Sequence, residues 1–164
     1  MKNQNFTTTF SVDQTPEEAF DAINNVRGWW SQTIEGETDR LGAVFFYHYQ
    51  DVHRCTFKIT ELVAGKKVVW HVLHNYFNFV EDQTEWNDTD IVFEIARKDD
   101  KREVRFTHVG LVPAYECYGV CSDAWGSYIN VEECEYPSRA DLLPARHLEF
   151  SFRFFCLVGT VNFF

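Results

Sequence analysis

The residue best suited to acid–base or hydrogen-bonding chemistry in this sequence is His108. It belongs to the alternating segment 104–109 (VRFTHV), in which Val104, Phe106 and His108 fall on the same side of a strand. A histidine on an apolar inner face can orient the polar group of a ligand, or act as an acid or base near neutral pH. The alternative is a buried histidine that is hydrogen-bonded to a neighbour or to the backbone. The spacing leaves both interpretations open.

Two cysteines follow on the next element, at helical spacing. Cys117, Cys121, Trp125 and Tyr128 are separated by four, four and three residues, which places them on one face of a helix. Structural zinc needs four ligands, and this cysteine spacing is not that of a zinc knuckle. Buried free cysteine behaves as a small hydrophobic residue. We therefore predict no metal site, and no cysteine nucleophile, because no third residue is marked to orient a Cys–His pair.

Four further histidines lie on neighbouring predicted strands: His48, His53, His71 and His74. Their positions share no single face, so we interpret them as scattered surface residues rather than as metal ligands. The sequence contains no glycine-rich phosphate loop and no G-x-S-x-G nucleophile motif. We accordingly predict no catalytic residues and no cofactor.

These residues are positioned by a run of strands between two helical regions. Thr15-Pro16-Glu17-Glu18 is a capping box with proline at the first helical position, and it predicts a helix that ends near residue 24. A short helical turn is expected at residues 26–30, where one of the adjacent Trp29 and Trp30 should pack inward while the other covers a seam. The predicted strands span residues 5–12, 44–50, 53–62, 67–75, 89–98 and 104–109.

Short turns between successive strands favour an antiparallel order. Residues 67–75 are apolar on both faces, which is typical of a central strand. We therefore predict an α+β fold in which a curved antiparallel sheet is wrapped around a long C-terminal helix. A cavity can open at the end where these layers separate.

One connection is long. Residues 76–88 (YFNFVEDQTEWND) carry four aromatic side chains among acids and amides. Long ordered loops are uncommon and are often functional. The alternative is a loop whose rings pack on the edge of the sheet, and both interpretations stay open.

Aromatic residues are frequent, at 17% of the chain, and large rings either fill a dense core or line a hollow one. Apolar walls with a few polar tips are what a small hydrophobic ligand requires. The predicted ligand-binding residues are Trp29, Tyr47, Phe57, Trp70, Phe93, Phe106, His108, Trp125 and Tyr128. The alternative is a filled core built from the same residues.

The length of the chain indicates its number of domains, and its charge argues against two classes of partner. The chain has 164 residues, which suits one domain with a substantial core. Its formal net charge of −10 opposes binding to nucleic acid, and no Lys/Arg-rich amphipathic helix suggests binding to an anionic membrane. The number of cysteines, five, is odd, which favours reduced thiols over a set of disulfides. The N-terminal segment is polar and does not resemble a secretion signal, so we expect a cytoplasmic location.

Several segments together resemble a known family. FTTTFSVDQTPEEAFDAI, VRGWW, DVHRCTFKITELVAGKKVVW and FTHVGLVPAYECYGVCSDAWGSYI are similar to the bacterial branch of the START-like (SRPBCC) superfamily, labelled as homologues of the activator of heat-shock protein 90 ATPase. The resemblance covers residues 5–130 and implies a helix-grip fold with an internal apolar cavity. Related domains bind lipids, sterols, polyketides or other hydrophobic small molecules.

The sequence departs from this family after Asn130. We divide the chain into a START-like domain at 1–130 and an atypical tail at 131–164, where Pro137 and Pro144 would break a continued helix. Residues 150–164 are apolar but too few for a comfortable membrane-spanning helix. Our hypothesis is that the tail arises from a frameshift, a read-through or an alternative exon; a native tail would add an edge strand or a partner contact. Sequencing the transcript tests it, and an uninterrupted frame shared with close relatives would overturn it.

The expected function is therefore binding of a hydrophobic small molecule in a cavity between sheet and helix. A co-chaperone-like ATPase activator, with a chaperone as partner, is the second hypothesis; we expect no separate chaperone-binding domain in a chain of this length. The third is an enzyme that uses the same cavity, with His108 as its proton carrier. The sequence leaves the ligand and the oligomeric state open.

Overall fold

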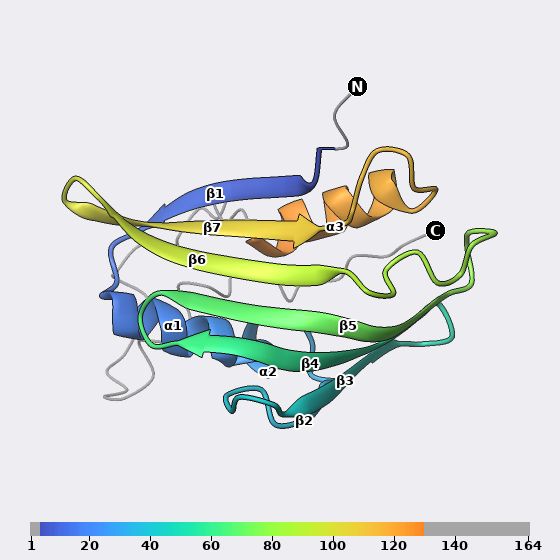
Figure 1. Cartoon of the computed structure of the whole chain (residues 1–164), viewed down its shortest axis with the longest axis horizontal. Helices are drawn as coiled ribbons and strands as arrows, with labels where there is room; N and C mark the ends of the chain where they lie inside the picture. The colour runs from blue at the N-terminus through green and yellow to red at the C-terminus, as the bar shows by residue number, and fades with distance from the viewer. Residues whose placement is uncertain (1–3, 130–164) are drawn as a thin grey trace, which may run out of the picture.

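The computed structural model describes residues 4–129, so the predictions made for the tail at 131–164 lie outside the described residues. The described chain forms one curved antiparallel sheet with helices on its inner side (Figure 1). The elements in chain order are β1 (Phe6–Val12), α1 (Pro16–Asn24), α2 (Val26–Trp29), β2 (Glu35–Gly36), β3 (Val44–Tyr49), β4 (His53–Val63), β5 (Lys67–Phe77), β6 (Asp90–Lys98), β7 (Lys101–Val109) and α3 (Tyr118–Ile129). The predicted α+β class is confirmed.

The strands lie in the order β1-β7-β6-β5-β4-β3-β2, and every neighbouring pair is antiparallel. The prediction that residues 67–75 form a central strand is confirmed, because β5 has three strands on either side. The first strand of the chain pairs with the last, with Phe6 opposite His108 and Phe10 opposite Val104. This pairing brings the N-terminal strand beside the strand that carries His108.

The predicted capping box at the start of α1 is confirmed. The hydroxyl of Thr15 accepts from the backbone N–H of Glu18 at 3.2 Å, and the Glu18 carboxylate accepts from the Thr15 N–H at 2.8 Å. These two bonds satisfy donors that the first turn of a helix otherwise leaves without partners. The helix then buries Ala19 and Ile23 against the inner side of the sheet.

Alternation along the strands builds the inner face. Cys55, Phe57 and Ile59 of β4 are buried, with exposed fractions of 3% or less. Ile91 and Phe93 of β6 are buried in the same manner. The faces predicted from the period of two are confirmed for both strands. A register irregularity between Thr56 and Phe57 leaves this alternation intact.

The expectation that only one of the two adjacent tryptophans packs inward was wrong. Trp29 and Trp30 are both buried, and both rings stack on Trp70 of β5, with centroids 6.1 and 6.3 Å apart. Trp30 still follows the helical backbone, because its N–H donates to the carbonyl of Val26 at 2.9 Å. The two side chains are about 100° apart around the helix, and both reach the aromatic side chains of the sheet.

Helix α3 covers the other part of the inner face, beside β1 and β7 (Figure 1). Cys121, Trp125 and Ile129 form its buried side. Cys121 and Trp125 were predicted on this face, whereas Ile129 is buried there and the predicted Tyr128 is only partly buried. Trp125 packs on Phe106 of β7 with ring centroids 4.8 Å apart. The helix is thereby held on the strand that carries His108.

Candidate functional site

The nine predicted ligand-binding residues lie together on the inner side of the sheet and on the helices that cover it. Eight are almost fully buried, with exposed fractions from 0% for Trp70 to 7% for Tyr47, and Tyr128 is partly buried. Their shared location is confirmed, whereas ligand binding by them stays a prediction. We call these nine residues, together with Trp30 and Trp86, the inner aromatic cluster.

Trp30 joins the two sides of this cluster and was not among the predicted residues. Its ring stacks on Tyr47 of β3 at 4.4 Å between centroids and contacts Trp125 of α3 at 5.1 Å. It therefore lies between the sheet and the helix. Sequence alone gave no signal for this role, because it depends on contacts with Tyr47 and Trp125, which are distant in the chain.

Trp86 is the second residue that the site prediction missed, and it comes from the long connection between β5 and β6. Its ring is 4% exposed, stacks on Trp125 at 5.7 Å and contacts His108 edge to face at 4.6 Å. The connection therefore delivers a ring to the interior rather than only to the sheet edge. The signal in the sequence was the unusual aromatic content of residues 76–88.

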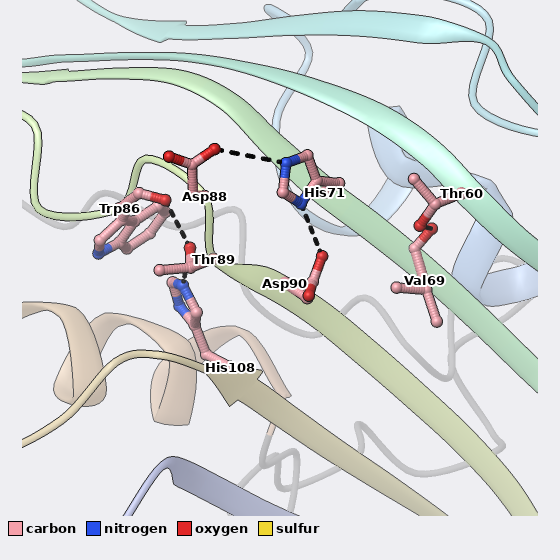
Figure 2. Close-up of polar contacts among 8 residues, drawn as sticks. All are labelled: Thr60, Val69, His71, Trp86, Asp88, Thr89, Asp90 and His108. Carbon is pink, nitrogen blue, oxygen red and sulfur yellow. Dashed lines mark hydrogen bonds and ion pairs between the residues drawn. The ribbon is translucent and has the colours of Figure 1, made fainter. Parts of the chain in front are cut away.

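His108 stands in a hydrogen-bonded chain that fixes its tautomer, and Figure 2 shows the part of it that links His108 to Thr89 and Trp86. The indole N–H of Trp125 donates to His108 Nδ1 at 3.2 Å, so Nδ1 carries a lone pair and Nε2 carries the proton. Nε2–H then donates to the hydroxyl of Thr89 at 2.9 Å. The Thr89 hydroxyl in turn donates to the carbonyl of Trp86 at 2.6 Å.

Burial, and after it the nearby His53, lowers the pKa of His108 to about 3. The ring is therefore neutral at physiological pH. Both of its nitrogens are already hydrogen-bonded within the protein, which is the structural alternative that the sequence left open. This arrangement suits a residue that positions Trp125 and Trp86 and does not suit a proton carrier.

Gly110 allows Thr89 to reach His108. Its φ is +99°, in the region that favours glycine, and a Cβ at this position would lie 2.6 Å from Cγ2 of Thr89. The glycine of the F-T-H-x-G segment thus has a physical role, because a side chain there would push Thr89 away from the hydrogen-bonded chain.

The long connection is also tied to the start of α3. The carboxylate of Glu85, which is buried, accepts from the backbone N–H of Glu116 at 2.7 Å and of Cys117 at 2.9 Å. In return, the Glu116 carboxylate accepts from the N–H of Glu81 at 2.8 Å. A carboxylate at the N-terminal end of a helix is favoured by its free N–H groups and by the helix dipole.

We predict that Glu85→Ala lowers the free energy of unfolding by about 1–3 kcal/mol, because the part-buried N–H of Glu116 and the buried N–H of Cys117 lose a charged acceptor. Urea unfolding measures the loss, and amide hydrogen exchange should accelerate at Glu116 and Cys117. Glu81→Ala is the matched control, since Glu81 is exposed and engages Glu116 through its backbone N–H. Equal stability of the two variants would contradict the capping role of Glu85.

The two cysteines of the α3 region are buried and free. A hydrogen bond with Cys121, together with burial, holds the pKa of Cys117 well above its usual range. Cys117 is thus a neutral thiol, which is the opposite of what a nucleophile requires. Among residues 4–129, no group of three or more His, Cys, Asp and Glu side chains is arranged to hold a metal ion.

His53 is not a surface residue of the kind predicted for the strand histidines. Its half-buried ring is enclosed by Phe77 at 4.5 Å, Trp86 at 4.9 Å and Tyr47 at 5.1 Å between centroids. Burial lowers its pKa to about 4, and the hydrogen bond to Asn75 partly offsets that effect. A neutral imidazole therefore borders the inner aromatic cluster.

The other strand histidines lie elsewhere. His48 and His74 are exposed, in agreement with the prediction. His71 is half-buried, and its Nδ1 lies 2.9 Å from a carboxylate oxygen of Asp90, with Asp88 at 3.7 Å from Nε2 (Figure 2). The chain 88–90 thus places two carboxylates beside His71 while Thr89, between them, points to His108.

Two indole N–H groups in the inner aromatic cluster have no hydrogen-bond partner among the described residues. They belong to Trp70 and Trp86, and both atoms are buried. A buried donor without a partner costs about 1–3 kcal/mol, so it calls for an acceptor. By contrast, the indole of Trp29 donates to the carbonyl of Ile23 at 3.0 Å.

Comparison with solved structures gives clear similarity in fold. The Aha1 dimer from Colwellia psychrerythraea has a TM-score of 0.60 and 23% sequence identity to this chain, over 76% of this chain and 90% of that one. MLL2253 from Mesorhizobium loti has the same TM-score and coverage at 12% identity. The chain has the helix-grip fold.

The helix-grip neighbours also include CalU16 from Micromonospora echinospora, with a TM-score of 0.53 and 12% identity over 74% of this chain and 69% of that one. DynU16, a protein in the dynemicin biosynthetic locus, has a TM-score of 0.57 and 10% identity over 77% of this chain and 45% of that one. No family model and no curated protein matched. Within residues 4–129, no helix is long and apolar enough to cross a bilayer.

Proposed function

We propose that this domain binds an apolar small molecule between the inner face of the sheet and α3. The observation that carries the proposal is the inner aromatic cluster with its two buried indole donors, Trp70 and Trp86, that lack partners in the described chain. Mostly apolar walls with a few polar groups are typical of ligand sites. An acceptor on a bound ligand would satisfy a donor that is otherwise left without one.

Similarity of fold supports this proposal without deciding the ligand. We also propose that the domain belongs to the bacterial START-like branch that its sequence resembles. The similarity in fold to the Aha1 structure supports this proposal, as does the positive φ of Gly110 and its close contact with Thr89 in the F-T-H-x-G segment. Cys55, Cys117 and Cys121 are free and buried, which supports a reducing, cytoplasmic location.

The expected result is that purified protein carries an apolar compound in native mass spectrometry, or that members of a lipid and aromatic library raise its Tm. A ligand that binds only the folded state adds about 2.7 kcal/mol of stability at a concentration of 100 times its Kd. Trp30→Ala should abolish the shift, whereas Phe46→Ala should keep it, because Phe46 is half exposed on β3 outside the cluster. A library that shifts nothing would contradict the proposal.

A co-chaperone role is the second candidate, and the similarity to the Aha1 structure is the observation that favours it. Its test is the rate of ATP hydrolysis by heat-shock protein 90 with and without this domain. Stimulation that persists in Trp30→Ala would assign the activity to a surface rather than to the inner aromatic cluster.

A further inference from the structure

We propose, building on the proposed function, that residues 79–87, in the connection between β5 and β6, form a gate to the inner aromatic cluster. The structure holds this gate closed, with the ring of Trp86 inserted in the cluster and the carboxylate of Glu85 bonded to the start of α3. Opening breaks the bonds of Glu85 and withdraws Trp86, so that an apolar ligand can enter. The gate then closes over the bound ligand.

The gate lies between two anchored ends. Before it, the backbone N–H of Asn78 donates to the carbonyl of Val52, in the turn between β3 and β4, at 3.0 Å. After it, the N–H of Asp88 donates to the carbonyl of Val72 on β5 at 3.1 Å. The chain on either side is thus held on the sheet, and residues 79–87 are the part that can move away from it.

Trp86 is the ring that the gate places in the cluster. Its centroid lies 4.6 Å from that of His108 on β7 and 5.7 Å from that of Trp125 on α3. It also contacts Phe77 on β5 at 5.3 Å and His53 on β4 at 4.9 Å. Figure 1 shows the connection at the end of the sheet where α3 begins. Withdrawal of Trp86 uncovers His108 and Trp125, which are at most 2% exposed in the closed structure.

The closed gate leaves a polar group unsatisfied, which favours opening. Nε1 of Trp86 is buried and has no hydrogen-bond partner within residues 4–129. Such a donor is unfavourable in the closed state, whereas in the open state it donates to water. Trp70 has the same unsatisfied donor, but it lies on the central strand β5 and cannot be withdrawn.

The carboxylate of Glu85 is the latch that opposes opening. It accepts from the backbone N–H of Glu116 at 2.7 Å and of Cys117 at 2.9 Å. The Glu116 carboxylate accepts in return from the N–H of Glu81 at 2.8 Å. These three bonds join the gate to the start of α3, and bonds to a carboxylate are about twice as strong as bonds between neutral groups.

The bonds that join the gate to β5 are neutral. The carbonyl of Gln83 accepts from the N–H of Phe77 at 3.0 Å and from Nδ2 of Asn75 at 3.2 Å, and Oδ1 of Asn87 accepts from the N–H of Asn75 at 2.7 Å. Glu85→Gln leaves these bonds in place and keeps an acceptor oxygen at the latch. It removes only the charge, so it weakens the latch selectively.

Hydrogen exchange at the indole N–H of Trp86 tests the motion without a ligand, on the full chain labelled with ¹⁵N-tryptophan. Low concentrations of urea should leave its exchange rate unchanged, because the gate opens without global unfolding. Glu85→Gln should raise the rate about tenfold and keep it independent of urea. A urea dependence as steep as that of global unfolding would overturn the gate.

Stopped-flow fluorescence with the neutral probe N-phenyl-1-naphthylamine tests entry. Glu85→Gln should raise the association and dissociation rate constants together, about tenfold, and leave Kd nearly unchanged, because opening precedes both entry and exit. A residue that merely supports the site would raise Kd instead. Glu103→Gln is the matched control. Its carboxylate pairs with Lys98 in the β6–β7 hairpin, so both rate constants should stay within about twofold of the wild type.

The outcomes separate the gate from the proposed function. If apolar compounds bind but Glu85→Gln leaves both rate constants unchanged, or raises dissociation alone, the gate is overturned and the proposed function stands. If exchange at Trp86 behaves as expected but neither the probe nor any library compound binds, the proposed function fails, and ligand entry through the gate fails with it. Should Glu85→Gln not fold, Glu116→Gln takes its place, with an expected rise of about threefold in both rate constants, because one bond of the latch loses its charge.

Discussion

Acidification from pH 6.5 toward pH 4 destabilises this domain steeply, with His108 alone contributing about 1.4 kcal/mol per pH unit. The pKa of His108 falls from 6.5 to about 3 in the folded protein because the ring is fully buried. The unfolded chain takes up a proton below pH 6.5, whereas the folded protein does not. The contribution of His108 to the free energy of unfolding is therefore complete above pH 6.5. It is lost as the pH falls toward about 3, the pKa of His108 in the folded protein.

Urea unfolding at several pH values between 7.5 and 4.5 measures this slope. His53, whose pKa is about 4 in the folded protein, adds to it in the same direction. His108→Phe should flatten the profile while it lowers stability at pH 7.5 by about 1–3 kcal/mol, because Trp125 and Thr89 each lose a partner. An unchanged slope in this variant would show that His108 is not the group that titrates.

Trp125→Ala has the largest expected effect of any single substitution, a loss of about 3–5 kcal/mol in the free energy of unfolding. The ring contacts Phe106, Trp30 and Trp86, which come from a strand, the α2 end and the long connection. Its removal would leave a cavity where three segments meet and would deprive His108 Nδ1 of its donor. Ligand binding should be lost with it.

The matched control is Val120→Ala on the same helix, at a position that is 52% exposed. Chemical denaturation should place this variant within about 0.5 kcal/mol of the wild type. If Trp125→Ala were equally mild, α3 would not be held on the sheet through this ring, and the inner aromatic cluster would not be one packed unit.

The features that were predicted correctly depend on residues that are close together in the sequence. Phe57, Phe93 and Phe106 were assigned to the inner face because strands alternate with a period of two, and a sheet buries whole faces at once. The Thr15 cap and the buried side of α3 were predicted for the same reason, since both depend on residues three or four positions apart.

What the sequence did not predict depends on partners from distant segments. Glu85 is one acid among several in its segment, and only the fold brings it to the N–H groups of Glu116 and Cys117. His53 borders the inner aromatic cluster because the connection after β5 folds back and places Trp86 in edge-to-face contact with it. No local pattern encodes such contacts, so the residues that complete the site were the ones that sequence reasoning missed.

The most direct test of ligand binding uses the five tryptophans of the chain as reporters. In a ¹⁵N–¹H spectrum of indole-labelled protein, titration with the library compound that raises Tm most should move the Trp70 and Trp86 cross-peaks saturably. The Trp29 cross-peak should move less, because its N–H already bonds Ile23. The account would be contradicted if no compound in the library moved the Trp70 or Trp86 cross-peak.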